Sequence, residues 1–280
     1  MVYPRILYSS YVLCFNNSGV IKTSLRSLQL QTIKPAQLFL TDDGSTDDSR
    51  TVADQLGVDV LAMDVNQGRG AARAASIDNA DYEFVVCCDA TNYLPSDYVA
   101  RSVDWFRDPR VAAVYGPITQ DCSHTLADRW RGRHLFRMAE GLSVQHHAGL
   151  CTWGCVVRAS SVREVGNFNP RLRHSEDIDL GRRLLDAGFD VVFDPSLCVY
   201  SSVSNTIPEV LERYWRWYVG VEEKLSFYGY AKQVWYSIKV MSLRDLRDGD
   251  FGSILLSLFS PHYQFWKTFC RVCSGRFRKH

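Results

Sequence analysis

The sequence predicts an α/β fold in which a mostly parallel sheet is covered by helices on both faces. Short apolar runs alternate with apolar residues at helical spacing through the first half of the chain, a rhythm typical of right-handed strand–helix–strand crossovers. The 280 residues are 46% hydrophobic and 22% charged, the composition of a globular chain with a full core. We expect the α/β domain to cover residues 1–225 and a helical C-terminal extension to cover residues 226–280.

Each element of the α/β region has its own signal. Apolar runs predict strands at residues 11–15, 37–40, 58–62, 84–88, 111–114, 155–157 and 191–193. Helical spacing predicts helices that begin near residues 21, 45, 69 and 176, and Pro208 opens a long helix. Asn17 or Ser18 is a candidate cap of the first helix, and Ser45 or Thr46 of the second. Residues 119–148 have a polar, helical pattern whose order we do not assign.

The overall charge excludes one class of function. The 32 basic and 31 acidic residues nearly cancel, so we expect no nucleic-acid partner. No stretch approaches the roughly 20 apolar residues of a membrane-spanning helix. The chain starts without a long apolar signal segment, and its nine cysteines are an odd number. These features favour free thiols in a reducing cytoplasm.

Polar clusters follow three of the predicted strands. They are Asn16–Asn17, Asp42–Asp43 and Asp89. In parallel sheets, ligands bind at the carboxyl ends of the strands. The three clusters therefore point to one site.

A series of short motifs resembles the family 2 glycosyltransferases, which have the GT-A fold. The motifs are Phe15-Asn16, Gln31-Thr32, Asp42-Asp43-Gly44-Ser45-Thr46-Asp47, residues 66–73 (NQGRGAAR), Asp89-Ala90-Thr91, Leu94-Pro95, Glu176-Asp177-Ile178-Asp179-Leu180 and Arg213-Tyr214-Trp215-Arg216-Trp217. Each motif is weak alone, but their order along residues 11–220 is specific. The resemblance implies inverting transfer of a sugar from a nucleotide diphosphate donor, such as a UDP-sugar, to a hydroxyl of a glycan or lipid-linked glycan.

The resemblance assigns a nucleotide-binding role to the first strand ends. Phe15, followed by Asn16, would stack on the donor base, a contact of about 1–3 kcal/mol. Asp43, with Asp42 beside it, would accept a hydrogen bond from the base; the alternative is that both only cap the following helix. Arg73 matches the family arginine that reaches the nucleotide, and the alternative for it is a solvated helix face.

Asp89 stands where the family has the first acid of its metal motif. The resemblance implies that Asp89 binds substrate through Mg²⁺ or Mn²⁺, but Thr91 replaces the second acid. Tyr200 and Ser201 occupy the region where many relatives carry a histidine ligand. One carboxylate and substrate phosphates can hold magnesium; alternatively, arginines neutralise the diphosphate. These departures also leave open a non-catalytic protein that binds a nucleotide sugar or a glycan.

The Glu176–Asp179 segment supplies the candidate catalytic base. By the resemblance, Asp177 removes the acceptor proton and Glu176 lies in the substrate site. Three acids at the start of one helix cannot all point to the same place, so we expect Asp179 to serve the helix dipole or a structural bond. The alternative is that all three acids only decorate a helix N-terminus.

Two tryptophan segments are candidate substrate contacts. Arg213, Arg216 and Trp217 are similar to a segment of the processive synthases in which arginine approaches the diphosphate and tryptophan lines the acceptor site. Trp153 lies where relatives line the donor sugar or the acceptor. The alternative for both segments is packing of the tryptophans into a core.

The C-terminal residues have two open interpretations. Ile254, Leu255, Leu258 and Phe259 form an apolar stripe, and the chain after Pro261 mixes aromatic residues with basic residues, among them Arg276, Arg278 and Lys279. This mixture suits an anionic membrane surface on the cytoplasmic face. Alternatively, the stripe packs on the catalytic domain and the basic end is solvated.

Overall fold

The computed structural model describes residues 6–121, 123–136, 142–218 and 226–277. The chain forms two compact units. The α/β unit comprises Met1–Asp121 and Glu140–Val203, and the helical unit comprises Cys122–Ala139 and Ser204–His280. The expected domain boundary at residue 225 lies outside the described residues, and the structure divides the chain elsewhere, because the chain enters the helical unit twice.

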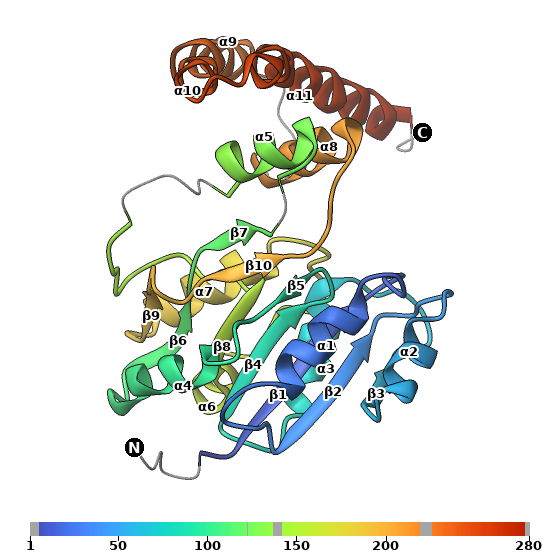
Figure 1. Ribbon diagram of the computed structural model, residues 1–280, viewed down its shortest axis with the longest axis vertical. Coiled ribbons are helices and arrows are strands. Elements are labelled where there is room, and N and C mark those ends of the chain that lie inside the picture. Colours follow the sequence, from blue (N-terminus) through green and yellow to red (C-terminus); the bar gives the residue numbers. More distant parts are fainter. Residues whose placement is uncertain (1–5, 122, 137–141, 219–225, 278–280) are drawn as a thin grey trace. The chain divides into compact units, whose positions relative to one another are not determined.

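A seven-stranded sheet forms the centre of the α/β unit (Figure 1). Its strands in spatial order are β3 (Asp59–Ala62), β2 (Gln37–Asp42), β1 (Tyr8–Cys14), β4 (Phe84–Asp89), β8 (Gly154–Arg158), β6 (Val111–Tyr115) and β9 (Asp190–Phe193). All neighbouring strands are parallel except the two pairs that include β8. The predicted mostly parallel sheet is confirmed, and a strand is present at each of the seven predicted places.

Helices cover both faces of this sheet. On one face α3 (Arg69–Asp78), α6 (Ala159–Glu164) and α7 (Glu176–Asp186) share a hydrophobic cluster with the strands. On the other face α1 (Ile21–Gln29) buries three apolar residues at helical spacing (Figure 1). The remaining helical elements of the unit are α2 (Ser49–Gln55), α4 (Tyr98–Ser102) and the 3₁₀ helix η1 (Val103–Arg107).

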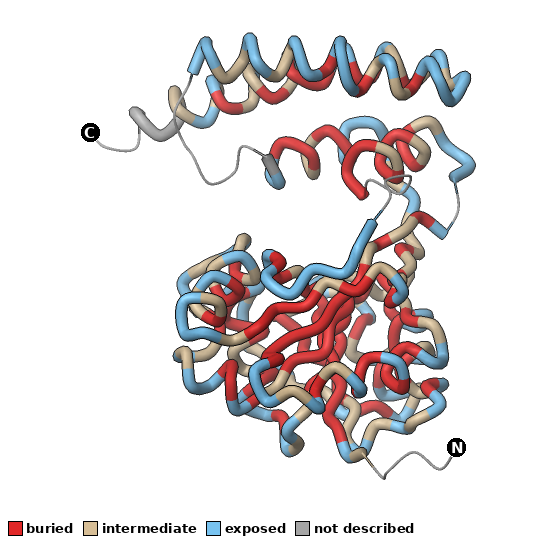
Figure 2. The backbone as a smooth tube through the Cα atoms, turned by 90° about the vertical axis from the view of Figure 1, so that its left-hand side faces the viewer, coloured by how far each residue is buried: buried red, intermediate tan, exposed pale blue. Residues whose placement is uncertain are grey.

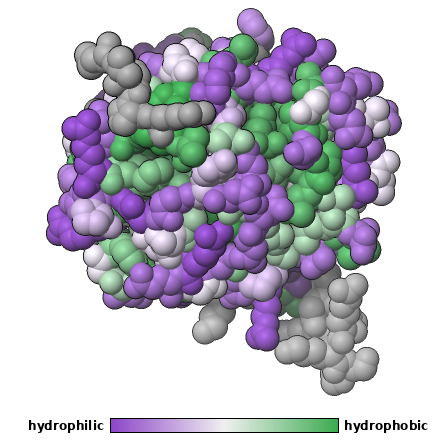
Figure 3. Space-filling model, turned by 90° about the horizontal axis from the view of Figure 1, so that it is seen from below, coloured by the Kyte–Doolittle hydropathy of each residue, from purple (hydrophilic) through white to green (hydrophobic). Residues whose placement is uncertain are grey.

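The central strands are buried along most of their length, as Figure 2 shows by colour. The outside of the molecule differs: on the face seen in Figure 3, hydrophilic residues cover much of the surface, with hydrophobic residues between them. Because parallel strands covered on both faces bury every side chain, their sequences are near-continuous apolar runs. The core of the α/β unit is therefore the sheet itself.

A second, three-stranded sheet lies at the end of the α/β unit. Its order is β5 (Asn92–Tyr93), β10 (Val199–Ser201) and β7 (Ile118–Gln120). The rings of Tyr93 and Tyr200 stack with centroids 5.2 Å apart across β5 and β10. Strand β5 follows β4 closely along the chain. Its pairing in this sheet therefore fixes the chain next to Asp89.

The helical unit consists of α-helices and one π-helical segment. They are α5 (Leu126–His134), α8 (Ile207–Tyr218), α9 (Phe227–Tyr236), the π-helical segment η2 (Ser237–Ser242), α10 (Leu243–Arg247) and α11 (Phe251–Phe277). Pro208 lies in the first turn of α8, as predicted, and α11 runs on through Pro261. None of the described helices is long and apolar enough to cross a membrane.

The predicted helix caps are wrong. Helix α1 begins after Val20 and α2 after Asp48, and neither cap makes a side-chain hydrogen bond. The backbone carbonyl of Asn17 accepts the first amides of the α1 turn instead. The polar side chains near these helix starts bond from loop to loop, and this arrangement builds the candidate site.

Candidate active site

The ends of β1, β2 and β4 lie next to one another at the carboxyl edge of the central sheet. In the strand register Cys14 pairs with Asp42, and Leu13 pairs with Asp89. The segments that follow these strands therefore start within one residue of the same level. The structure brings together the three polar clusters that the sequence places at strand ends.

Phe15 and Asn16 follow β1 directly. The backbone of Asn16 is left-handed (φ 52°). Its amide donates to Ser45 Oγ (2.8 Å), and its side-chain Oδ1 accepts from the amide of Thr46 (2.8 Å). These bonds fix the loop while the side chain of Phe15 stays 44% exposed. An exposed aromatic ring therefore lies at the strand end, next to an ordered loop.

Asp43 holds the loop that precedes α3. Its carboxylate accepts hydrogen bonds from the amides of Gln67 (2.8 Å) and Gly68 (2.9 Å). Gly44 has a positive φ of 74°, and a Cβ at this position would lie 2.6 Å from the backbone of Asn66. Only glycine therefore lets the two loops approach so closely. Asp43 is almost fully buried, and its present bonds order the loop.

Asp42 is fully buried, and one of its carboxylate oxygens holds neighbouring parts of the chain. Its Oδ2 accepts from the amide of Ser45 (3.1 Å) and from Nε of Arg50 (2.6 Å). Its Oδ1 is buried without a hydrogen-bond partner among the described residues, and the expected contact of Asp42 with substrate stays a prediction. The structure excludes the alternative that Asp42 and Asp43 are helix caps, because α2 begins after Asp48.

Arg73 is the centre of a buried charged cluster. Its guanidinium donates to Asp89 Oδ1 (2.6 Å), to Glu176 Oε1 (3.1 Å) and to the hydroxyl of Tyr11 (3.1 Å). The arginine side chain is 1% exposed, so the alternative of a solvated helix face is wrong. The cluster links the end of β4, through Asp89, to the start of α7, through Glu176.

Glu176 and Asp177 begin α7 but occupy different environments. Glu176 is buried against Arg73, whereas Asp177 is half-buried and accepts a hydrogen bond from the amide of Ile178 (2.9 Å). Burial, and then the negative charge of Glu176, raise the pKa of Asp177 to about 6. Asp179 bonds Arg183 at 2.7 and 3.0 Å, which confirms its predicted structural role.

Tyr115 and Cys151 are neighbours of Asp177 that the sequence did not indicate. Burial raises the pKa of the Tyr115 hydroxyl and of the Cys151 thiol, and the negative charge of Asp177 adds to this effect. Tyr115 ends β6, so the rule that sites form at strand ends could have found it. Cys151 lies in a segment without regular secondary structure, and no sequence signal marks it.

Trp153 lies beside this group. Its indole nitrogen donates to the carbonyl of Gly116 (3.0 Å), and its ring meets Tyr115 edge-on, with centroids 6.1 Å apart. The carbonyl of Trp153 accepts from the side chain of Asn92 (2.8 Å). Trp153 is half-buried, so it packs on the core and still exposes part of its ring.

The described residues offer few metal ligands. No group of three acids, histidines or cysteines in the described ranges could hold a metal ion. Asp89 supplies a carboxylate at the end of β4, and Arg73 bonds one of its oxygens. The carbonyl of Thr91 accepts from the amide and the hydroxyl of Ser202. Such a set fits an ion that takes most of its ligands from substrate phosphates and water.

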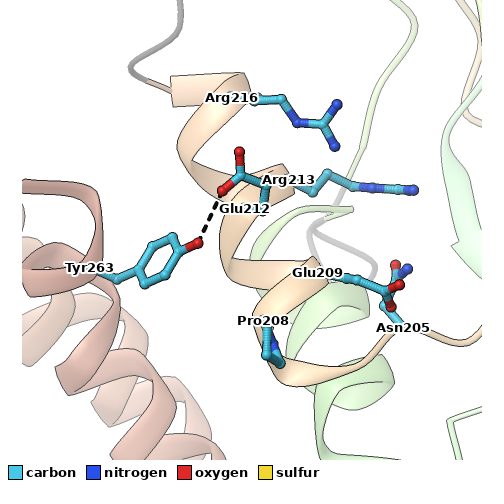
Figure 4. A pocket seen from close by; sticks show the side chains of 7 residues that line it. All are labelled: Asn205, Pro208, Glu209, Glu212, Arg213, Arg216 and Tyr263. Carbon is cyan, nitrogen blue, oxygen red and sulfur yellow. Dashed lines mark hydrogen bonds between the residues drawn. The ribbon is translucent and has the colours of Figure 1, made fainter. Parts of the chain in front are cut away.

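The other expected substrate contacts lie on α8 of the helical unit. A pocket of about 460 Å³ there is lined by Asn205, Pro208, Glu209, Glu212, Arg213, Arg216 and Tyr263. Figure 4 shows the guanidinium groups of Arg213 and Arg216 extending to the same side of the helix. Glu212 accepts from the Tyr263 hydroxyl (3.0 Å) and pairs with Lys267 (2.9 Å). The pocket is therefore lined by two cationic side chains, Arg213 and Arg216, and by the Glu212 carboxylate, which Tyr263 and Lys267 fix in place.

Trp217 is the second acceptor candidate on α8. It is 43% exposed, and its ring lies 6.2 Å from that of Phe136. The neighbouring Trp215 is buried and donates to Thr268 of α11 (3.0 Å). The alternative of core packing thus holds for Trp215, whereas Trp217 presents its ring to solvent.

Solved structures with the same fold include a mannosyltransferase and the protein TarS. A mannosyltransferase from Pyrobaculum calidifontis, in complex with GDP-Man and Mn²⁺, matches all of this chain and 77% of its own, with a TM-score of 0.55 and 15% identity. S. aureus TarS 1-349, in complex with UDP, matches 98% of this chain and 93% of its own, with a TM-score of 0.56 and 14% identity. The fold is that of the GT-A transferases.

The family follows from the sequence match. The model of glycosyl transferase family 2 matches residues 9–166, which is more than half of the chain. The chain belongs to glycosyl transferase family 2, and the predicted family and fold are confirmed.

Curated relatives include poly-beta-1,6-N-acetyl-D-glucosamine synthases. The protein from Staphylococcus epidermidis is 22% identical over 243 residues, which cover 82% of this chain and 57% of that protein. The protein from Staphylococcus aureus (strain MSSA476) is 24% identical over 225 residues, which cover 76% and 54%. This chain spans about half the length of these relatives.

Proposed function

We propose that the protein is an inverting glycosyltransferase that moves a sugar from a nucleotide diphosphate to an acceptor hydroxyl. The observation that carries the proposal is Asp177, a half-buried carboxylate whose pKa is raised to about 6. A group that accepts a proton in the transition state works best with a pKa near the operating pH. Asp177 lies next to the cluster that holds the end of β4, where ligands of such sheets bind.

The strand ends supply the proposed donor site. Phe15 is exposed and fixed in place, so it suits stacking on a base, a contact of about 1–3 kcal/mol. Asp43 holds the Gly68 loop close to this point. The complexes of similar fold with UDP and GDP-Man support a nucleotide sugar as donor.

The transfer balances as a single displacement. The acceptor O–H bond breaks and its proton passes to Asp177, while the acceptor oxygen forms a bond to the anomeric carbon. The bond from that carbon to the diphosphate breaks, and the nucleotide diphosphate leaves with the electron pair. Attack opposite the leaving group inverts the anomeric centre. A positioned base contributes about 10²–10⁴ in rate.

A divalent cation, Mg²⁺ or Mn²⁺, is part of this proposal. Asp89 would hold it together with the donor phosphates, and the cation would neutralise charge on the leaving diphosphate. Arg73 keeps the Asp89 carboxylate in place through a bond of 2.6 Å. The structure with Mn²⁺ among the neighbours supports the same cofactor class here.

A glycan or lipid-linked glycan is the proposed acceptor. The names of the curated relatives support a polysaccharide product, and aromatic rings such as Trp153 and Trp217 suit sugar faces. For the compartment we propose the cytoplasm, because the eight cysteines of the described residues are free thiols.

The test is Asp177→Asn, with Asp186→Asn as the matched control. Asp186 is an exposed acid at the far end of the same helix. We expect Asp177→Asn to lower turnover at least about 100-fold and to leave the affinity for a nucleoside diphosphate within a few-fold, as measured by calorimetry. The control should retain full turnover.

The stability of the variant serves as a folding control. The folded pKa of Asp177 is raised from 3.8 to about 6, so the folded state binds more protons than the unfolded chain between these values. Its free energy of unfolding therefore falls as pH rises through this window, and the ionised carboxylate is destabilising at pH 7. Asp177→Asn should be at least as stable as the wild type. Retention of more than a tenth of turnover in a stable variant would mean that another group is the base.

A further inference from the structure

Exposed large hydrophobic residues are concentrated in the helical unit. Sixteen of the 23 such residues in the described ranges lie there, although this unit holds only about a third of the chain. A contiguous exposed apolar surface on a folded protein marks an interaction site. The distribution calls for a partner of this unit.

Helix α11 has its polarity reversed relative to a helix in water. Its exposed face carries Phe251, Leu255, Leu258, Phe259, Trp266 and Phe269 at helical spacing, with Leu255 at 72% and Phe259 at 52% exposure. Its buried face is mostly polar and carries Ser253, Ser257, Ser260, Gln264 and Thr268 together with the apolar Leu256. In Figure 2, buried and exposed residues alternate along the turns of the helices in this unit.

The buried face of α11 is held by hydrogen bonds between side chains. Trp130 of α5 donates to Ser257 (2.8 Å), and Ser257 donates to Asp245 of α10 (2.6 Å). Trp215 of α8 donates to Thr268 (3.0 Å). Small and polar residues between helices, with apolar residues turned outward, are typical of helices whose solvent is lipid.

The segment α9–η2–α10 extends this exposed surface. It packs beside α11 (Figure 1) and joins it at a turn in which Gly249 has a φ of 69°. Phe227, Trp235, Ile238, Leu243 and Leu246 are exposed along it. We call the exposed apolar residues of α11 and of this segment the outer face.

The charges of the two segments are segregated. Asp245, Asp248 and Asp250 all pair with Arg129 or Arg133 of α5, which lies at the buried side of α11. These are all the acidic residues between 226 and 280. Basic side chains such as Lys232, Lys239 and Arg247 are exposed on the segment that carries the apolar residues. The outer face therefore combines apolar residues with an excess of positive charge.

We propose that the outer face binds an anionic membrane surface, with α11 and α9–η2–α10 lying in the plane of the interface. Helices with one apolar face and one polar face lie in this way, and exposed cations attract anionic lipids by about 1 kcal/mol each. Tryptophans such as Trp235 and Trp266 suit the boundary between headgroups and acyl chains. The inference rests on the helical unit alone and does not depend on the proposed function.

The outer face differs from the surface that the sequence predicts. Most of the expected basic end lies outside the described residues: Arg278 and Lys279 are not among them, and the side chain of Arg276 is not described. Leu255, Leu258 and Phe259 of the predicted stripe are exposed on the helical unit. The binding surface begins at Phe227, well before this end of the chain.

The test is flotation of the full chain with vesicles of phosphatidylcholine alone or mixed with phosphatidylserine. The double variant Leu255→Glu/Phe259→Glu places charges in the outer face. The matched control Leu7→Glu/Leu30→Glu alters two apolar residues of the α/β unit that are 47% and 64% exposed. We expect the wild type and the control to float with the mixed vesicles, and the outer-face variant to bind them at least about tenfold more weakly.

Further arms of the experiment separate lipid from other partners. Lys232→Glu/Lys239→Glu should weaken binding to the mixed vesicles only, and added salt should do the same. Affinity for nucleoside diphosphate should be equal in all variants, which also shows that they fold. The proposal is overturned if the wild type floats with neither vesicle, or if the outer-face variant binds like the control. It is also overturned if the wild type is a dimer in solution that the Leu255→Glu/Phe259→Glu change dissociates.

Discussion

Asp177 and Glu176 are adjacent carboxylates at the start of one helix, yet their surroundings separate their roles. The N-terminus of α7 favours negative charge, and Arg73 neutralises Glu176 at 3.1 Å. Asp177 is half-buried, accepts a hydrogen bond from the amide of Ile178 and lies beside the negative charge of Glu176. The pKa of Asp177 is therefore raised, which is the property that a base working near neutral pH requires.

This raised pKa predicts the pH dependence of the transfer. Asp177 must be ionised to accept a proton, so kcat/KM should rise with pH through about 6 and level off above pH 7. At one unit below the pKa about a tenth of the carboxyl groups are ionised, so the rate should be about tenfold lower. The measurement is kcat/KM from acid to mildly alkaline pH. A profile that is flat across this range would count against Asp177, and Asp186→Asn should reproduce the wild-type profile.

Arg73 predicts a large effect on stability. Arg73→Ala would leave the buried Glu176 without its cation, and breaking a buried ion pair from one side costs about 3–5 kcal/mol. We expect this loss in the free energy of unfolding measured with denaturant. The matched control is Arg69→Ala, an exposed arginine on the same helix, which should change stability by less than about 0.5 kcal/mol. A similar small loss for Arg73→Ala would show that the cluster is not what holds α3 to α7.

At the scale of elements, close backbone contacts hold the loops around the site. A Cβ on Gly70, in the first turn of α3, would overlap the carbonyl oxygens of Asn169 and Leu172. The amide of Gly70 also donates to Leu172 (2.9 Å). This contact fixes the loop that leads to α7 against the helix that carries Arg73. No sequence pattern identifies it, because the partner is about 100 residues away.

Gly70→Ala should therefore disturb the site through the backbone. We expect it to destabilise the α/β unit by about 1–3 kcal/mol, as overpacking does, and to lower turnover. Gly19→Ala is the control, because a Cβ on Gly19 meets nothing within 4 Å. Thermal unfolding and turnover of the two variants would decide the matter; equal behaviour would mean that the two segments move apart at little cost.

The elements themselves could be predicted where the signal is local. Each buried strand is an apolar run, and α3 and α7 begin where the pattern places them. The caps could not be predicted, because Ser45 and Thr46 bond to Asn16 from the neighbouring strand end instead of to their own helix. The apolar stripe of α11 was recognised as helical, but the sequence does not show which face is exposed.

At the scale of the molecule, the division into units could not be read from the chain. Helix α5 follows β7 in sequence, and a polar segment between strands gives no sign that it joins α8 and α11. The packing of α5 with α8 and α11 becomes clear only from long-range hydrogen bonds, such as that from Trp130 to Ser257, which are 127 residues apart. The candidate site was more predictable, because strand ends in a parallel sheet converge by topology.

The division into two units predicts which part of the protein a bound nucleotide stabilises. The proposed donor site lies entirely in the α/β unit, at the ends of β1, β2 and β4. A ligand stabilises the part of a protein whose opening abolishes its binding, by about 2.7 kcal/mol at 100 times the dissociation constant. The amides of the helical unit would gain protection from hydrogen exchange only to the extent that the two units unfold together.

Hydrogen exchange read by segment tests this with UDP and GDP as the added ligands. We expect amides of β1, β4 and α3 to exchange more slowly with the bound nucleotide, while those of α9 and α11 keep their rates. The variant Phe15→Ala, which lacks the stacking ring, should show a weaker effect at the same nucleotide concentration, and Leu30→Ala, an exposed apolar residue of the same unit, should behave like the wild type. Slower exchange in α8 and α11 alone would place the nucleotide in the pocket of Arg213 and Arg216, and the donor site proposed at the strand ends would be wrong.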